Sequence, residues 1–280
     1  MNKTTILFLF ILSLSLFSFI DGNKKKNDLE KDNIHGRVKS IHVYEYNRAG
    51  QQNMEIDPLK ISLNDTNKHS IINYDRNGNL VESINSNGIK TESCSYDSSM
   101  KKIHSFTFNI KDNTKQEGFY SYDNKGMLIE IRSITIKKDT PELKTLYKYD
   151  AKNMLVETDW YTKNKYTYKW LYKYDESRKE IENIKINASD SLLEKWVYEY
   201  NGMGNKTELA LYNDSLIERF VYTYNENGDV TEEILYGRFN RMFHDYKYKF
   251  EYDNKSNWVR RVYYEGATQK SNIVRVYEYY

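Results

Sequence analysis

A short phrase recurs along most of this chain and constrains its fold more than any other feature. It reads Tyr-x-Tyr-Asp/Asn-x-x-Gly and is followed by Glu, as in residues 221–232, Val-Tyr-Thr-Tyr-Asn-Glu-Asn-Gly-Asp-Val-Thr-Glu. Its second tyrosine returns every 22 to 28 residues. Self-similarity at such a period predicts an array of supersecondary units. These anchor tyrosines are Tyr46, Tyr74, Tyr96, Tyr122, Tyr149, Tyr174, Tyr200, Tyr224, Tyr252 and Tyr279.

The residues that follow each anchor tyrosine predict a turn. An Asp or Asn comes directly after most of them, and a glycine often stands four positions after the tyrosine, as in Gly78, Gly126 and Gly228. An Asp or Asn that opens a type I turn, closed by a residue in the left-handed region, is typical of a short β-hairpin loop. Met100 and Arg178 take the glycine place in two copies, where we expect backbone strain or a longer loop.

Each hairpin predicts a ladder of side chains on one face. If Asp75 pairs with Asn79, Tyr74 lies across from Leu80, and Ile72 lies across from Glu82. Tyrosines dominate the position two before the anchor, and glutamates dominate the position eight after it, so the pattern predicts tyrosine hydroxyls bonded to carboxylates. Cys94 falls in the tyrosine column, which predicts a packed thiol and not a nucleophile. The glutamates are Glu82, Glu130, Glu157, Glu182, Glu208 and Glu232.

The other face mixes apolar and charged side chains. Lys148, Lys173, Glu199 and Glu251 stand one before their anchors, between columns of Leu, Ile and Val. We therefore predict an all-β fold of tandem antiparallel β-hairpins in one continuous twisted or coiled sheet. The sequence leaves open whether this sheet is an open single layer, a spiral or a partial shell.

The N-terminal region divides into two parts. Residues 1–22 read as a signal peptide, because an apolar run from Ile6 to Ile20 follows Lys3 and ends near Gly22. An uncleaved N-terminal anchor is the alternative, although the run is short of the roughly 20 residues that span a membrane. Residues 23–33 are polar and charged, which predicts a linker, and residues 34–280 form the repeat array.

The charge pattern limits the partners. The chain carries 42 Lys and Arg against 40 Asp and Glu, for a net charge of +2, and the signs alternate without a basic cluster. We therefore expect no nucleic-acid partner. The single cysteine excludes an internal disulfide.

Four large aromatic residues form the candidate binding site. Trp170, Trp196, Phe220 and Tyr248 stand four before their anchors in the later copies, where the earlier copies have small or polar residues. Such an aromatic ribbon is either a platform for sugars or an apolar partner, or a place where the later half buries its own face. Its solvent exposure decides between a site and a core.

Catalysis, metal binding and membrane insertion have weaker support. Paired glutamates on neighbouring hairpins, such as Glu182 and Glu208, would suit glycoside hydrolysis, yet a catalytic residue should be singular and these recur. The five histidines lack ligand spacing, so we expect no metal and no cofactor. A membrane β-barrel would need an uninterrupted apolar face, and the lysine and glutamate columns argue against it.

The repeated phrase resembles the Tyr-Asp (YD) repeats of RHS-type bacterial surface and toxin-shell proteins. The resemblance is carried by segments 74–80, 122–128 and 224–230 and covers nearly all of residues 34–280. It implies a β-hairpin array, placement outside the cytoplasm and a role in binding or encapsulation. The period here is longer than that of the family, and no cargo domain follows the array.

The sequence thus predicts a bacterial protein that is secreted, periplasmic or on the cell surface. We expect a non-enzymatic binding or structural surface with no membrane span after removal of the signal peptide. Its expected partner is an unidentified protein or glycan at the cell surface. A carbohydrate-binding module that uses the aromatic ribbon is the alternative, and a glycoside hydrolase is the third possibility.

Overall fold

The computed structural model describes residues 26–46, 68–136 and 142–280. The described chain contains one short α-helix, α2 (Asp28–Lys31), one turn of 3-10 helix, η5 (Arg238–Asn240), and 18 strands. The predicted signal peptide and residues 47–67 lie outside the described residues. The strands are β1 (Val38–Tyr46), β2 (Lys68–Tyr74), β3 (Leu80–Asn85), β4 (Lys90–Tyr96), β5 (Lys102–Asn109), β6 (Thr114–Tyr122), β7 (Leu128–Ile136), β8 (Leu143–Tyr149), β9 (Leu155–Thr162), β10 (Lys165–Tyr174), β11 (Glu180–Asn187), β12 (Leu192–Tyr200), β13 (Lys206–Asn213), β14 (Ser215–Tyr224), β15 (Val230–Gly237), β16 (Met242–Tyr252), β17 (Trp258–Glu265) and β18 (Thr268–Tyr279).

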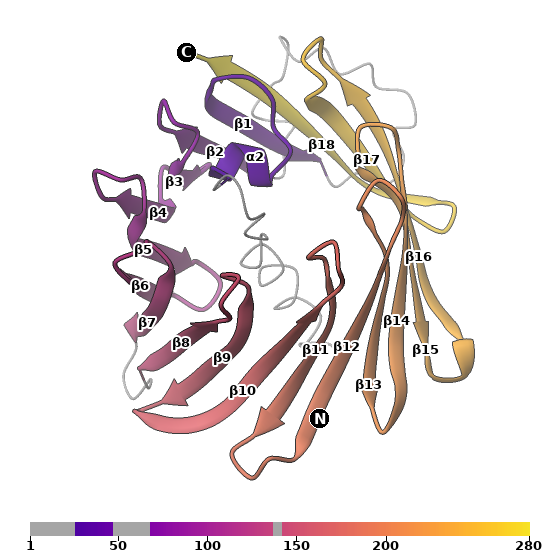
Figure 1. The fold of residues 1–280 in the computed structure, drawn as a ribbon. Helices are drawn as coiled ribbons and strands as arrows, with labels where there is room; N and C mark the ends of the chain where they lie inside the picture. The colour runs from indigo at the N-terminus through magenta and orange to yellow at the C-terminus, as the bar shows by residue number, and fades with distance from the viewer. Residues whose placement is uncertain (1–25, 47–67, 137–141) are drawn as a thin grey trace.

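The strands form one closed antiparallel barrel (Figure 1). Each strand pairs with its neighbours in sequence, and β1 also pairs with β18, so that Ile41 lies opposite both Ile72 on β2 and Tyr277 on β18. The all-β expectation agrees with this architecture, but the expected open layer, spiral or partial shell is wrong. Closure pairs the backbone groups that an open sheet would leave free on its two edge strands.

The repeated turns follow the predicted chemistry. Oδ1 of Asp75 accepts hydrogen bonds from the backbone N–H of Asn77 (2.8 Å) and of Asn79 (2.9 Å), and Gly78 has a φ of 81°. Met100 and Arg178 adopt φ of 59° and 65° in loops of the same length. These two copies therefore carry left-handed backbone strain and do not lengthen the loop.

A bulge after each turn overturns the predicted ladder of tyrosines and glutamates. Tyr74 lies opposite Leu80 as expected, but the register then shifts, so Glu82 pairs with Asn73 and not with Ile72. The extra residue is Val81. A bulge of this kind shifts the pairing of every later residue on β3 by one position, which moves its side chain to the opposite face of the sheet. The same shift places Glu130 opposite Ser121, Glu157 opposite Lys148, Glu182 opposite Lys173, Glu208 opposite Glu199 and Glu232 opposite Thr223.

Six of the anchor tyrosines instead bond to the backbone of the preceding hairpin, whereas Tyr252 and Tyr279 donate to Asp229 and Asp253 in the preceding turns. The hydroxyl of Tyr174 donates to the carbonyl oxygen of Leu155 at 2.8 Å, and each acceptor is the residue six positions after the previous anchor. A hydrogen bond of this kind contributes about 1 kcal/mol. The series is Tyr96 to Leu80, Tyr122 to Lys102, Tyr149 to Leu128, Tyr174 to Leu155, Tyr200 to Glu180 and Tyr224 to Lys206.

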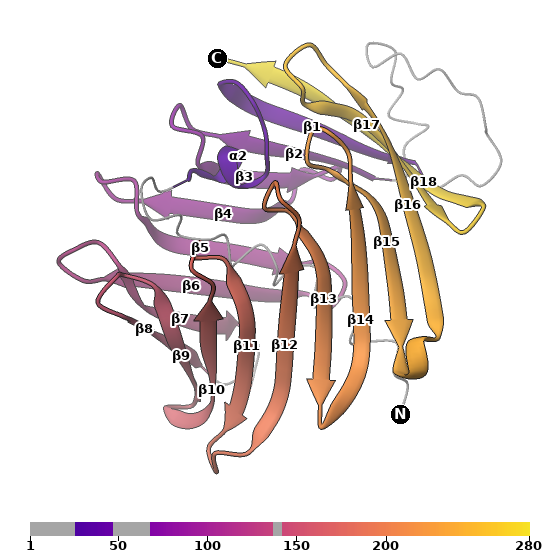
Figure 2. The same cartoon turned by 45° about the vertical axis from the view of Figure 1, so that its right-hand side comes forward.

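The tyrosine-bearing face is the inner face of the barrel. Helix α2 lies inside the ring, beside β1, β2 and β3 (Figures 1 and 2). Leu29 and Ile34 of this segment form a buried cluster with Val38, Ile41 and Tyr74. Because side chains alternate along a strand, the positions that share a face with Tyr74 point inward around the ring.

The outer face carries a belt of ion pairs. Glu182 lies 2.6 Å from the ammonium of Lys173 and 2.6 Å from that of Lys195 on the next strand. Lys148 likewise contacts both Glu157 and Asp159. The lysine and glutamate columns were expected on opposite faces, but the bulge places both on the outside. Exposed pairs of this kind contribute at most about 1 kcal/mol each.

Candidate inner-wall binding site

All four residues of the predicted aromatic ribbon lie on the inner wall, but in different rows. On β11, Trp170 lies opposite Lys185 and Trp196 lies opposite Asn183, two positions away. On β13, Trp196 lies opposite Leu211 and Phe220 lies opposite Leu209, with the same offset. Trp196 is 6% exposed, whereas the other three are partly exposed. The ribbon is therefore a staggered band across the strands and not one continuous platform.

A group of five aromatic rings lies farther along the same wall, on β16 and β17. The ring centroids of Tyr248 and Tyr263 are 5.6 Å apart, those of Tyr246 and Tyr263 are 5.5 Å apart, and those of Phe250 and Trp258 are 6.1 Å apart. Sequence reasoning included only Tyr248 of this group in the site. Trp258 stands six positions after the anchor Tyr252, where the other hairpins have Leu, Lys, Glu or Val, and that departure was the available signal.

A hollow of about 270 Å³ opens beside these rings. Three aromatic side chains provide ring faces, while charged groups provide one guanidinium donor and two carboxylates. Such a mixture of ring faces and a few polar groups is typical of small-molecule sites. The lining residues are Asp229, Val230, Glu233, Tyr248, Phe250, Trp258 and Arg261.

Two arginines lie over the Trp258 ring on this wall. The guanidinium carbon of Arg275 lies 3.6 Å from the centroid of the Trp258 ring, and that of Arg261 lies 5.3 Å from it. Burial lowers the pKa of Arg261, and the neighbouring charge of Arg275 lowers it further. Arg275 occupies the last member of the column that holds the aromatic ribbon, four before Tyr279, so extending that column would have found it.

The carboxylates of the hollow differ in their environment. Asp229 accepts a hydrogen bond of 2.7 Å from the hydroxyl of Tyr252. Glu233 lies between Tyr222 and Tyr246 in the strand register, and burial raises its pKa above the usual range for glutamate. Glu233 is therefore a partly desolvated hydrogen-bond acceptor in this wall.

On the opposite wall, small side chains lie between the inward tyrosines. The register places Ser83 opposite Ile72, and Ser105 lies between Cys94 and Gly118 on the inner face. Cys94 is 8% exposed and burial raises the pKa of its thiol, which agrees with a packed residue. The tryptophans of the interior thus lie on strands β9 to β17, whereas β2 to β8 contribute tyrosines and small side chains.

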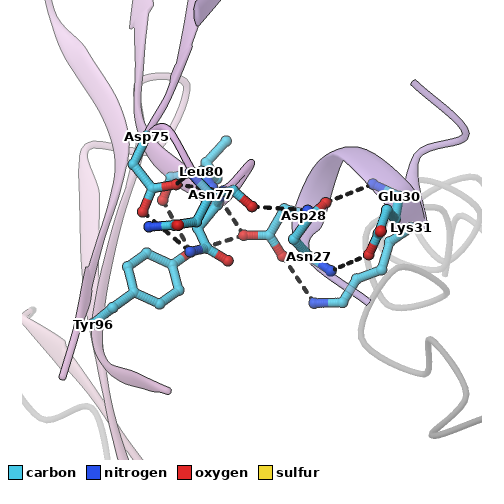
Figure 3. A network of polar contacts seen from close by, with 9 residues as sticks. Asn27, Asp28, Glu30, Lys31, Asp75, Asn77, Leu80 and Tyr96 are labelled. Carbon is cyan, nitrogen blue, oxygen red and sulfur yellow. Dashed lines mark hydrogen bonds and ion pairs between the residues drawn. The ribbon is translucent and has the colours of Figure 1, made fainter. Parts of the chain in front are cut away.

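A polar network ties the N-terminal segment to one mouth of the barrel (Figure 3). Asp28 accepts hydrogen bonds from the backbone N–H of Leu80 (2.9 Å) and from the hydroxyl of Tyr96 (2.8 Å). Asn27 donates to the carbonyl of Asn77 (2.8 Å) and closes a capping box with Glu30. This stretch lies within the predicted linker, and in the structure it is fastened to the turn between β2 and β3.

The same segment continues across the mouth. The amide of Asn33 donates to the carbonyl of Asn227 in the turn between β14 and β15 (3.0 Å). The backbone N–H of His35 donates to Asn257 in the turn after β16 (2.7 Å), and the amide of Asn257 returns a bond to the carbonyl of His35 (2.8 Å). Residues 27–35 therefore bridge turns that are far apart in the ring.

The residues considered for catalysis or metal binding are placed elsewhere. Glu182 and Glu208 lie on the outer face, where Glu208 pairs with Arg219 at 3.1 Å. Burial raises the pKa of Glu182, but its bonds to Lys173 and Lys195 outweigh that effect and hold it below the usual range. Among the described residues, no group of three His, Cys, Asp or Glu side chains is arranged to hold a metal ion.

No protein-family model and no curated protein matches this chain. A solved porin-like protein from Bacteroides uniformis is similar at 10% identity, covering 86% of this chain and 98% of that one, with a TM-score of 0.41. A TcdB2-TccC3-Cdc42 complex is also similar, at 12% identity over 74% of this chain and 15% of that one, with a TM-score of 0.29. So is the Photorhabdus luminescens Tc holotoxin pore, at 12% identity over 83% of this chain and 18% of that one, with a TM-score of 0.27.

These likenesses are too distant to assign a function, and the resemblance to YD repeats stays a prediction. In the part of the chain that the structure describes, no helix has the length and apolar character needed to cross a membrane. The function therefore has to be inferred from the side chains of the barrel itself.

Proposed function

We propose that this protein is a non-enzymatic binding protein of the bacterial envelope or exterior, and that it holds its ligand against the inner wall of the barrel. The observation that carries the proposal is the group of ring faces on β16 and β17, which borders a hollow of about 270 Å³. Aromatic rings beside a few polar groups are suited to sugars, which present apolar ring faces and hydroxyl groups. Carbohydrate is therefore the ligand class that we favour.

The charges on the outer face favour a barrel whose outer surface is in contact with water and not with lipid. Paired charges encircle it, including Lys173 with Glu182 and Arg260 with Glu251. A lysine or arginine facing lipid at the middle of a bilayer costs about 2–4 kcal/mol. The proposed location outside the cytoplasm rests on the signal-like residues 1–22. Fractionation of the native host tests this point, because a lipid-embedded barrel would require detergent for release and a water-exposed one would not.

Intrinsic fluorescence offers a direct test of ligand binding. The strand register places Trp160, Trp170, Trp196 and Trp258 all on the inner wall. A sugar bound there should change the tryptophan emission, and Trp258→Ala should remove most of the affinity. The matched control is Tyr264→Ala on the outer face of the same strand, which should bind normally.

Two results would count against the proposal. One is a panel of oligosaccharides that produces no change in emission and no heat of binding with the folded protein. The other is a ligand whose affinity falls with Tyr264→Ala and not with Trp258→Ala, because that ligand would sit on the outer face. A purely structural role for the barrel would give the first result.

A further inference from the structure

We infer that Arg261 and Arg275, together with the ring of Trp258, form an anion-binding subsite that takes the carboxylate of an acidic saccharide. This inference deepens the proposed function and rests on it. Arg261 projects from β17 and Arg275 from β18, and the register places them two positions apart on adjoining strands of the inner wall. Both guanidiniums lie over the same indole, at 5.3 and 3.6 Å from its centroid.

Neither Arg261 nor Arg275 has a carboxylate within ion-pair distance among the described residues. The Nε atoms of both are buried without a hydrogen-bond partner, and a terminal nitrogen of Arg275 donates to the hydroxyl of Tyr277 at 3.5 Å. On the outer face, Arg219 also has an unpaired Nε, but it bonds Glu208 at 3.1 Å, and Arg260 bonds Glu251 at 2.8 Å. The missing carboxylate partner therefore distinguishes the inner pair from these two outer arginines.

An empty subsite of this kind is electrostatically unfavourable. Two like charges lie side by side, and the charge of Arg275 contributes to the lowered pKa of Arg261. The charges of Asp229 and Glu45 act in the opposite direction and raise the pKa of Arg261, but among the described residues neither carboxylate is in an ion pair with it. Contact with aromatic faces offsets only part of this cost, because a cation over a ring gains about 0.5–2 kcal/mol.

An oxyanion placed beside the two guanidiniums would offset their mutual repulsion. The planar fork of arginine matches the two oxygens of a carboxylate, which makes such bonds stronger than those between neutral groups. The distribution of polar groups thus favours a ligand with at least one carboxylate.

The rest of the hollow indicates what the carboxylate is attached to. Tyr248 and Phe250 present ring faces beside Arg261, and Glu233 adds an acceptor for a hydroxyl. The volume of about 270 Å³ is slightly below the range of roughly 300–1,000 Å³ found for drug-sized ligands, so it suits one ring-sized group. A sugar ring that carries a carboxylate combines these features, whereas a bare inorganic anion would leave the ring faces unused.

Titration calorimetry with an oligogalacturonate, a neutral galactose oligomer of the same length and inorganic phosphate tests the inference. The acidic oligomer should bind best, and Arg261→Gln and Arg275→Gln should each weaken it about tenfold to a hundredfold, as expected for a lost bond between charged groups. Arg260→Gln, next to Arg261 but on the outer face, should leave the affinity unchanged.

Thermal unfolding provides a second readout that does not need the ligand. Because Arg261→Gln removes half of a repelling pair, the variant should unfold at the same temperature as the unmodified protein or at a higher one. A large decrease would show that Arg261 holds the wall together, and would overturn its assignment as a binding residue.

The outcomes of the titration separate the two proposals. If both oligomers bind equally and the inner arginine variants bind normally, the carboxylate subsite is wrong and the proposed function stands. If phosphate binds as tightly as the acidic oligomer, the site is for bare anions and the saccharide assignment is wrong. If neither oligomer binds, this inference and the proposed carbohydrate ligand both fail.

Discussion

The hydroxyl of Tyr174 lies 2.8 Å from the carbonyl oxygen of Leu155, a residue of the preceding hairpin. The bond recurs with the same spacing around much of the ring, so each repeat is joined to the one before it by its own anchor side chain. This explains why a tyrosine, and not another large residue, marks the repeat: only its ring reaches across the inner wall with a donor at the tip.

Removing one of these hydroxyls should weaken the barrel measurably. Tyr174→Phe keeps the ring and leaves the Leu155 carbonyl without this donor, so the free energy of unfolding should fall by about 1 kcal/mol. Denaturant unfolding followed by circular dichroism measures the change. Tyr264→Phe, on the outer face, is the control and should be nearly neutral. Equal losses in the two variants would contradict the role assigned to the anchor hydroxyls.

The left-handed turns predict a pair of opposite effects on stability. Arg178 has a φ of 65°, so Arg178→Gly should raise the free energy of unfolding by about 1 kcal/mol through relief of strain. Gly228 has a φ of 80°, and an added Cβ would meet no atom within 4 Å. Gly228→Ala should therefore lower stability by a similar amount through backbone strain alone. The same sign for both variants would refute the turn geometry.

Lys206 predicts one component of stability that increases at alkaline pH. Burial lowers its pKa to about 8, while Glu180 opposes this shift, and its ammonium lies 3.7 Å from the ring centroid of Tyr198. Between pH 8 and about 10 the unfolded chain holds this proton and the folded one does not, so the contribution of Lys206 to stability should rise with pH. The inner tyrosines, whose pKa burial raises, contribute in the opposite direction as the pH approaches 10. The contribution reaches about 3 kcal/mol at most.

Thermal unfolding at a series of pH values, with Lys206→Met for comparison, measures this contribution. The variant should be more stable near pH 7 and should lack the component of the rise that Lys206 contributes between pH 8 and 10. Lys169→Met on the outer face should keep the pH dependence of the unmodified protein. Identical pH profiles for Lys206→Met and the unmodified protein would show that Lys206 is not buried as described.

The tether of the N-terminal segment predicts a local opening. Asp28→Ala removes the acceptor of the Leu80 N–H and of the Tyr96 hydroxyl, bonds to a charged group that contribute about 1.5–3 kcal/mol each. Amide exchange of Leu80 should become faster, with little change in distant strands such as β12. Lys31→Ala, which removes only the 2.8 Å ion pair to Asp28, should have a smaller effect. Unchanged exchange at Leu80 in Asp28→Ala would contradict the tether.

The sequence predicted the local structure of this barrel better than its closure. The Asp and Gly spacing around Asp75 and Gly78 determines a turn within a few residues, so it can be recognised in one copy and checked in the next. The register beyond the turn could not be predicted, because the bulge at Val81 depends on how the loop joins the strands. That single residue decides whether Glu82 points inward or outward.

Closure and the site depend on relationships that no short stretch contains. The pairing of Ile41 with Tyr277 joins the two ends of the ring, and nothing near either residue specifies it. The aromatic column led to Tyr248 on the correct wall, but the arginines beside it come from two different columns, with Arg261 nine positions after one anchor and Arg275 four before the next. Their meeting over Trp258 follows from the register of three strands.

A disulfide between the first and last strands tests the closed barrel most directly. His42 and Val276 are partners in the register of β1 and β18 and lie on the outer face, at a separation typical of bridged cysteines. In a Cys94→Ser background, His42→Cys with Val276→Cys should form an intramolecular disulfide under mild oxidation. The control pair, Lys249→Cys with Val262→Cys, bridges the neighbouring strands β16 and β17 and should form in a closed or an open sheet. A disulfide in both pairs confirms the ring, whereas a disulfide in the control pair alone would show that the sheet is open.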